Sequence, residues 1–229
     1  MHIPDGFLSP EVAAAAAVPA VAAVAYGLRR TARDLDERRV PLLGVTAAFV
    51  FAVQMLNFPV AAGTSGHLLG AALAAVLLGP WAACVVMAVV VSAQAFVFAD
   101  GGVTALGANV LNMGIVGALT VGLGMALVVR VLPRGRTPFL AVAGAGAWLA
   151  VMLGALATSV ELALSDTVPL STVLPAMLGV HALIGVGEAV ITVAALGAVL
   201  VARPDLVTIR PRGLATPAPR VPAPGSVTP

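Results

Sequence analysis

Long uncharged apolar runs fill most of this 229-residue sequence and constrain its fold more than any other feature. Hydrophobic residues make up 60% of the chain against 10% charged residues, and the mean hydropathy is +1.07. So few charges cannot give a water-soluble domain its polar surface, whereas a bilayer accepts apolar helix faces. The sequence therefore predicts an all-α, polytopic helical bundle in the cell membrane.

Polar and turn-forming segments divide the apolar runs into about seven predicted transmembrane helices. A helix needs about 20 residues to cross a bilayer, so the third is too short to span it. The preceding residues 57–66 are expected to enter the membrane in irregular form, covered by protein or a polar cavity. The seven expected ranges are 10–30, 41–56, 67–79, 80–98, 107–132, 138–164 and 175–202.

The arginines predict the orientation of these helices. They follow the first helix, the fifth helix and the seventh helix, and the sequence contains no lysine. With seven spans the three groups fall on one side, which the positive-inside rule makes cytoplasmic. The N-terminus and the loops at 57–66, 99–107 and 165–175 then face outward. No basic residue precedes Arg29, so a signal peptide is not indicated and Met1 is expected to be the mature terminus.

Domain organisation follows from the same pattern. Residues 1–202 form one predicted transmembrane domain, and the Pro-rich residues 203–229 are expected to be a disordered cytoplasmic tail. The single cysteine, Cys84, lies in an apolar run and is expected to be a buried small side chain. Because the arginines sit at membrane boundaries, the basic net charge does not indicate a nucleic-acid partner.

Met1, His2 and His67 all fall on the outer side of this topology. A metal ion bound to the Met1 α-amine and the His2 amide nitrogen closes a five-membered ring, and the nearer His2 imidazole nitrogen closes a six-membered ring. Three nitrogens are thereby preset in one plane, and His67 can supply the fourth. Such a plane suits Ni(II) or Cu(II), with Co(II) possible. Binding requires a neutral amine and loss of the amide proton, so we expect uptake to fall as pH drops.

Other polar residues on the outer side are candidates to support this metal site. Asp100 begins a predicted turn with Gly101-Gly102, which caps a helix or lines an access path. Asn109 lies, with Gln94 and Asn112, in apolar surroundings where polar side chains usually bond neighbouring helices. Four further residues are candidates to orient the imidazoles: Asp5, Asn57, Thr64 and Ser65.

His181 and Glu188 lie seven residues apart and so share one face of the seventh predicted helix. Ionisable residues inside a membrane indicate function, and two roles stay open, a hydrogen-bond network near the metal or direct contact with it. A different alternative uses Ser65, in the GTSG segment, with His181 as the dyad of an intramembrane serine protease. That alternative leaves the pattern of Met1, His2 and His67 unexplained.

Four segments carry a resemblance to a known family. They are MHIPDGFLSP at the start, QMLNFPVAAGTSGHLLGAAL with VLLGPW within 54–81, FADGGVTALGANVLNMG at 98–114, and HALIGVGEAVIT at 181–192. They resemble the CbiM/NikM family, the nickel- and cobalt-binding (S) membrane subunits of energy-coupling-factor (ECF) transporters. The resemblance covers about residues 1–202.

The resemblance implies a fold and a ligand set. The N-terminal segment would be inserted into an all-helical bundle, where the Met1 amine, the His2 backbone and side-chain nitrogens and the His67 imidazole bind the ion. The first helix would be the family's extra segment. The remaining six would be the core shared with vitamin-binding S subunits.

The resemblance also implies a function, in which Ni(II) or Co(II) is the transported substrate and no organic cofactor is needed. The partners would be a transmembrane scaffold (T) subunit, two cytoplasmic ATPase subunits and a small accessory membrane protein. The 229 residues contain no GxxxxGK[ST] motif, so ATP hydrolysis would lie in the partners and this chain would not be an enzyme. The bundle would capture the ion outside and tilt to release it inside. A stand-alone secondary metal carrier is the alternative.

Overall fold

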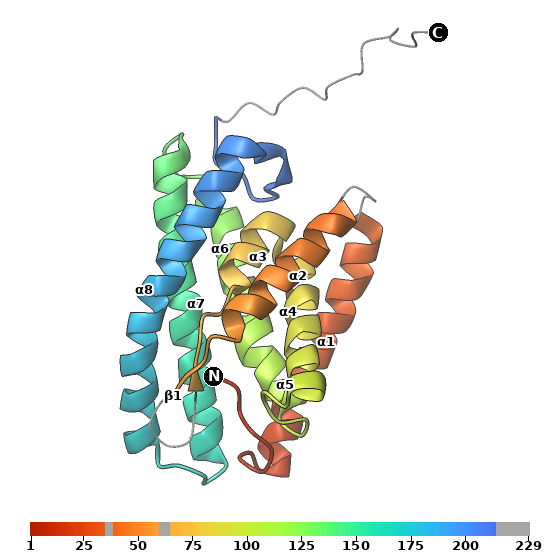
Figure 1. Cartoon of the computed structure of the whole chain (residues 1–229), viewed down its shortest axis with the longest axis vertical. Helices are drawn as coiled ribbons and strands as arrows, with labels where there is room; N and C mark the ends of the chain where they lie inside the picture. Colours follow the sequence, from red (N-terminus) through yellow and green to blue (C-terminus); the bar gives the residue numbers. More distant parts are fainter. Residues whose placement is uncertain (35–38, 60–64, 214–229) are drawn as a thin grey trace, which may run out of the picture.

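The computed structural model describes residues 1–34, 39–59 and 65–213, and it shows a bundle of roughly parallel and antiparallel helices (Figure 1). The seven predicted helices are confirmed within these residues, and the fifth is built from three consecutive pieces. The elements are α1 (Pro10–Asp34), α2 (Val40–Gln54), α3 (Ala71–Leu78), α4 (Pro80–Phe98), α5 (Leu106–Asn109), η2 (Val110–Val116), α6 (Gly117–Val128), α7 (Arg136–Leu164) and α8 (Leu170–Ala202).

Five of the helical segments are long and apolar enough to cross a membrane, counting α5, η2 and α6 as one segment of 23 residues. The two shorter helices are α2, with 15 residues, and α3, with eight. The predicted shortness of the third helix is thus confirmed. It begins at Ala71, later than the predicted residue 67, because residues 67–70 form the loop that carries His67.

The start of α8 differs from the sequence prediction. The helix begins at Leu170 and contains Pro175, whereas residues 165–175 were expected to form a loop. The N–H groups of Thr172 and Val173 both donate to the Pro169 carbonyl, at 2.9 and 3.1 Å, and so start the first turn before the proline. A proline this close to a helix start removes one backbone bond without ending the helix.

The short helix α3 lies in the centre of the bundle. Its residues 71–77 are all buried, and it packs between α4, α6 and α7. Alanine side chains there allow neighbouring backbones to approach closely, as in other membrane helix interfaces. At eight residues, α3 is about 12 Å long, which is too short to span a membrane.

The arginine-bearing ends of the helices lie together, as the topology prediction requires. The end of α1, the α6–α7 connection and the segment after α8 are at one end of the bundle, and the α7–α8 turn is at the other (Figure 1). We call these the cytoplasmic and the outer end, following the positive-inside rule.

The segment after α8 differs from the expected disordered tail over residues 203–213. It forms the 3-10 helix η3 (Pro204–Leu206) and then runs along the end of α3. Thr208 and Ile209 donate backbone N–H groups to the Leu77 and Val76 carbonyls, both at 3.1 Å. The prolines of this segment disfavour a long α-helix, but they do not prevent backbone hydrogen bonds from Thr208 and Ile209 to α3. The rest of the predicted tail, 214–229, lies outside the described residues.

Candidate metal centre

The N-terminal segment enters the bundle (Figure 1). Met1 is 0% exposed, Ile3 1% and His2 4%. The Asn109 amide pairs with the Ile3 backbone twice: the Ile3 N–H donates to Oδ1 at 2.8 Å, and Nδ2 donates to the Ile3 carbonyl at 3.0 Å. The Gly102 N–H donates to the same carbonyl at 2.8 Å. These bonds fix the backbone immediately after Met1 and His2.

Two adjacent glycines make room for this segment. Gly101 has a φ of +95°, and a Cβ there would lie 3.0 Å from His2 Cδ2. A Cβ on Gly102 would overlap the backbone nitrogen of Asp5. The Asp5 carboxylate accepts hydrogen bonds from the Thr104 N–H and hydroxyl, at 2.7 and 2.6 Å, and these bonds lower its pKa. Asp5 therefore anchors the segment and lies outside the histidine cluster.

The imidazoles of His2 and His67 stack on one another, with ring centroids 4.6 Å apart and 29° between the planes. Gln94 Oε1 lies 3.1 Å from His2 Nε2, and because this oxygen can only accept, Nε2 carries the ring proton. His2 Nδ1 therefore keeps its lone pair. It lies 3.3 Å from Asp100 Oδ1 without hydrogen-bond geometry. Two acceptors that face one another in this way favour a cation beside them.

A short hairpin carries His67 into the bundle. The strands β1 (Phe58–Pro59) and β2 (Ser65–Gly66) pair antiparallel, with Phe58 opposite Gly66. His67 is fully buried, and its Nδ1–H donates to the Leu68 carbonyl at 2.8 Å. His67 Nε2 therefore presents a lone pair, and among the described residues it has no hydrogen-bond partner.

Glu188 and Gln54 fix the loop between His67 and α3. The Glu188 carboxylate accepts from the N–H groups of Leu69 and Gly70, at 2.8 and 2.7 Å. Gln54 Nε2 donates to the Leu69 carbonyl at 2.6 Å. Gly70, with a φ of +75°, is the N-cap residue of α3 and has no side chain to cap the helix, and the Glu188 carboxylate holds the two backbone N–H groups that directly precede α3. Glu188 therefore positions the backbone that carries His67.

His181 lies fully buried on α8, two helical turns before Glu188. Its Nδ1–H donates to the Met177 carbonyl at 2.7 Å, so its Nε2 also keeps a lone pair. That atom has no hydrogen-bond partner in the described part of the chain. The hydrogen bond to Met177 lies within α8, so both roles proposed for His181, in a hydrogen-bond network near the metal or in direct contact with it, stay predictions.

Burial keeps the nitrogens of this centre uncharged. It lowers the pKa of the Met1 α-amine to about 5, against the opposing attraction of the Asp100 carboxylate. Burial, followed by the nearby amine, lowers the pKa of His2 to about 4. For the same two reasons the pKa of His67 lies well below its usual value. At pH 7 all three groups therefore offer lone pairs.

The remaining predicted residues fall into two groups. Asn57 Nδ2 donates to Asp100 Oδ2 at 3.0 Å, so Asn57 orients the carboxylate and not an imidazole. Thr64 and the side chain of Ser65 lie outside the described residues, so the proposed Ser65–His181 dyad stays a prediction. Among the described residues, no three His, Cys, Asp or Glu side chains group as metal ligands. A metal centre here would need the main-chain nitrogens of Met1 and His2.

We predicted a general helix-packing role for Gln94, whereas in the structure the Gln94 side chain accepts from His2 Nε2 and so sets which His2 nitrogen carries the proton. A buried glutamine near the end of an apolar helix, six residues before Asp100, was the available signal. The sequence predicted that Gly101 and Gly102 form a turn. That this turn packs against the N-terminal backbone could not be predicted without the fold.

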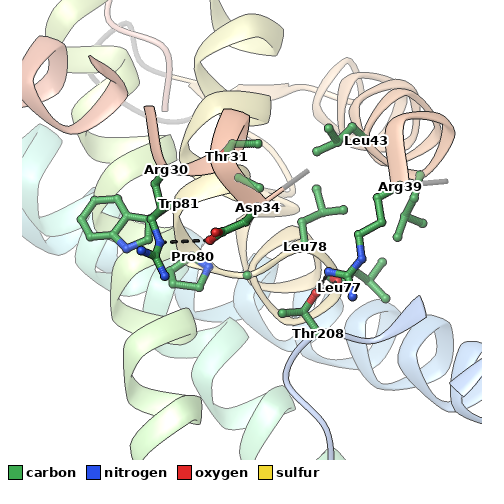
Figure 2. Close-up of a pocket in the computed structure, with 13 residues that line it drawn as sticks. Arg30, Thr31, Asp34, Arg39, Leu43, Leu77, Leu78, Pro80, Trp81 and Thr208 are labelled. Carbon is green, nitrogen blue, oxygen red and sulfur yellow. Dashed lines mark hydrogen bonds and ion pairs between the residues drawn. The ribbon is translucent and has the colours of Figure 1, made fainter. Parts of the chain in front are cut away.

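A separate cavity of about 260 Å³ (Figure 2) is lined by residues from the ends of α1 and α3, the starts of α2 and α4, and the segment after α8, at the cytoplasmic end of the bundle. Arg30, one of the lining residues, pairs with Asp34 at 3.0 Å, while Arg39 donates to Thr208 at 3.2 Å. No histidine lines it among the described residues. The cavity is therefore not part of the candidate metal centre.

The fold and this centre define a class, the multi-pass membrane proteins built around a buried N-terminus. The family model described as "Cobalt uptake substrate-specific transmembrane region" matches residues 2–206. The chain belongs to this family, CbiM/NikM, of nickel and cobalt transport membrane proteins.

Individual relatives agree with this assignment. A putative fused nickel transport protein, NikMN, of Archaeoglobus fulgidus is 39% identical over 209 residues, covering 90% of this chain and 68% of its own. The cobalt transport protein CbiM 1 of Pelobacter propionicus is 41% identical over 166 residues, covering 71% of this chain and 70% of its own. The crystal structure of a truncated transition metal transporter matches with a TM-score of 0.79 at 32% identity, covering 87% of this chain and 98% of that one.

Proposed function

We propose that the chain is the substrate-binding subunit of an ATP-driven importer and binds Ni(II) or Co(II) through four nitrogens. These are the Met1 α-amine, the deprotonated His2 amide nitrogen, His2 Nδ1 and His67 Nε2. One observation carries the proposal: the buried N-terminus lies beside His2 and His67, and each imidazole has a nitrogen that makes no hydrogen bond to any described residue. Nitrogen ligands of this kind suit Ni(II) and Co(II).

The charge of the surroundings supports this ligand set. A divalent ion with one deprotonated amide carries a net charge of +1, and the Asp100 carboxylate beside His2 Nδ1 offsets it. A buried charge without such a partner would be strongly unfavourable. Asn57, which donates to the other Asp100 oxygen, holds that carboxylate in place. Asp100 therefore acts as a counter-ion to the bound metal.

Energy for transport would come from partner subunits. The chain contains no P-loop motif, so we infer a transmembrane scaffold subunit and two cytoplasmic ATPase subunits, with a small accessory membrane protein. Family membership supports the assignment of transport, and the arginine-rich end is the side on which ATPases would act. Tilting of the bundle after capture would expose the ion to the cytoplasm.

Paired alanine substitutions test the ligand set. His67→Ala removes a ligand and is expected to weaken Ni(II) affinity by at least about 100-fold, more than loss of an outer-shell group. His181→Ala is the matched control, since it removes a buried imidazole that our ligand set does not use, and it should cost less than about tenfold. Equal losses in isothermal titration of the two variants would place His181 among the ligands.

Reconstituted vesicles test the coupling. Nickel uptake should require the scaffold and ATPase subunits together with ATP, and it should be absent with this chain alone. Uptake by the chain alone, driven by an ion gradient, would instead favour the secondary carrier.

A further inference from the structure

A second polar cluster lies between the candidate metal centre and the outer end of α7. Glu161 Oε2 accepts a hydrogen bond from Asn112 Nδ2 at 2.6 Å, and the same nitrogen lies 3.3 Å from Thr158 Oγ1. Thr158 and Asn112 are fully buried, while Glu161 keeps 9% exposure. Among the described residues no basic side chain pairs with Glu161.

The cluster also contains an oxygen atom without a partner, because Asn112 Oδ1 is buried and accepts no hydrogen bond within the described residues. The same holds for Ser165 Oγ, four residues after Glu161. Asn112 comes from η2, a π-helical stretch, and such stretches widen a helix and often occur at functional sites. Unsatisfied buried oxygens beside a carboxylate are groups that a hydrated cation would satisfy.

The cluster is continuous with the N-terminal centre. Gly154, Thr158 and Glu161 follow one another at helical spacings of four and three residues along one face of α7, and Ser165 directly follows the helix. A Cβ at Gly154 would lie 3.2 Å from both Met1 Sδ and the Asn112 carbonyl oxygen. The same face of α7 thus reaches from Glu161 near its outer end to the side chain of Met1.

We propose that Glu161, Asn112 and Thr158 form a staging site that holds a hydrated divalent transition-metal ion before it reaches the N-terminal nitrogens. This inference rests on the proposed function. Oxygen ligands bind Ni(II) and Co(II) more weakly than nitrogen ligands do, so an ion held here would pass on to the four nitrogens. The site would raise the rate of association and would leave the final complex unchanged.

Stopped-flow mixing with aqueous Ni(II) tests the staging site, with formation of the Ni(II)–nitrogen absorption band as the signal. Glu161→Gln keeps an acceptor for Asn112 but removes the charge, and it should slow association by about tenfold. Because the final complex keeps its stability, dissociation should slow by the same factor and the final band should be unchanged. Thr158→Val keeps the side-chain volume and should slow association by a smaller factor. It provides the test if Glu161→Gln fails to fold.

Asp166→Asn is the matched control, because Asp166 is an exposed carboxylate at the same end, and its φ of +53° is tolerated by asparagine. This variant should change the association rate by less than about twofold. Wild-type rates in both cluster variants, or equal slowing by Asp166→Asn, would overturn the staging site. Absence of the band in the wild-type protein would instead refute the nitrogen ligand set.

Discussion

At the scale of single residues, the candidate centre is defined by where the ring protons lie. His67 and His181 each donate Nδ1–H to a backbone carbonyl, at 2.8 and 2.7 Å, and keep Nε2 for another use. His2 has the opposite tautomer, because its Nε2–H donates a hydrogen bond to Gln94 Oε1 and its Nδ1, the nitrogen nearest the backbone, keeps a lone pair. This is the nitrogen that a chelate with the His2 amide requires. Such outer hydrogen bonds commonly set the tautomer of a metal-binding histidine.

The lowered pKa values give a count of protons released on metal binding. The pKa of the Met1 amine is about 5 and that of His2 about 4, so both are already neutral at pH 7. Only the His2 amide must then lose a proton, and we expect about one proton released per Ni(II) at pH 7. At pH 5 the amine is half protonated, so the count should rise and the affinity should fall.

Isothermal titration in two buffers of different ionisation enthalpy measures this count. Release of about two protons at pH 7 would show that the amine has its ordinary pKa and is not buried as described. Constant affinity down to pH 5 would show that binding releases no proton, and so that the His2 amide nitrogen is not deprotonated by the metal.

At the scale of elements, a loop and a half-length helix deliver His67 to the N-terminus. The irregular segment before α3 was predictable, because the apolar run after residue 66 is too short to span a bilayer. The contacts that hold it were not predictable from spacing. Glu188 accepts a hydrogen bond from the N–H of Leu69, which is 119 residues away in the sequence. That pairing depends on how α8 packs against the loop.

The Gly101-Gly102 turn packs directly against the N-terminal segment and so fixes the position of that segment. Gly102→Ala should displace that segment, because the new Cβ would overlap the Asp5 backbone, and should weaken Ni(II) binding by more than about tenfold. Gly124→Ala is the matched control, since a Cβ there meets no atom within 4 Å. Equal Ni(II) affinity of the two variants, measured by titration with matching circular dichroism spectra, would mean that the turn does not position the segment.

At the scale of the whole molecule, the sequence predicts the bundle well and its side-chain pairings poorly. The membrane imposes span length and arginine placement directly on composition, so the seven helices and their common arginine-bearing end could be predicted. The route of residues 203–213 could not, because its bonds to the end of α3 join backbone atoms more than a hundred residues apart.

Because of this packing, we expect two C-terminal truncations to differ in thermal stability. Ending the chain at Gly213 should leave thermal stability in detergent unchanged, since the folded contacts of the segment are kept. Ending it at Ala202 removes buried Val207 and Ile209 and the backbone bonds to α3, and should lower the melting temperature by roughly 5 °C or more. Equal melting temperatures would mean that the segment does not contribute to stability.

The nitrogen ligand set is tested most directly by extending the N-terminus. Ni(II) would be added to purified protein that begins at Met1 and to protein extended by a single glycine, and the absorption spectrum of each would be recorded. We expect the band typical of planar four-nitrogen Ni(II) in the first protein and its loss in the second, because the extension moves the amine out of the chelate. The same band and affinity in both proteins would contradict the participation of the Met1 amine.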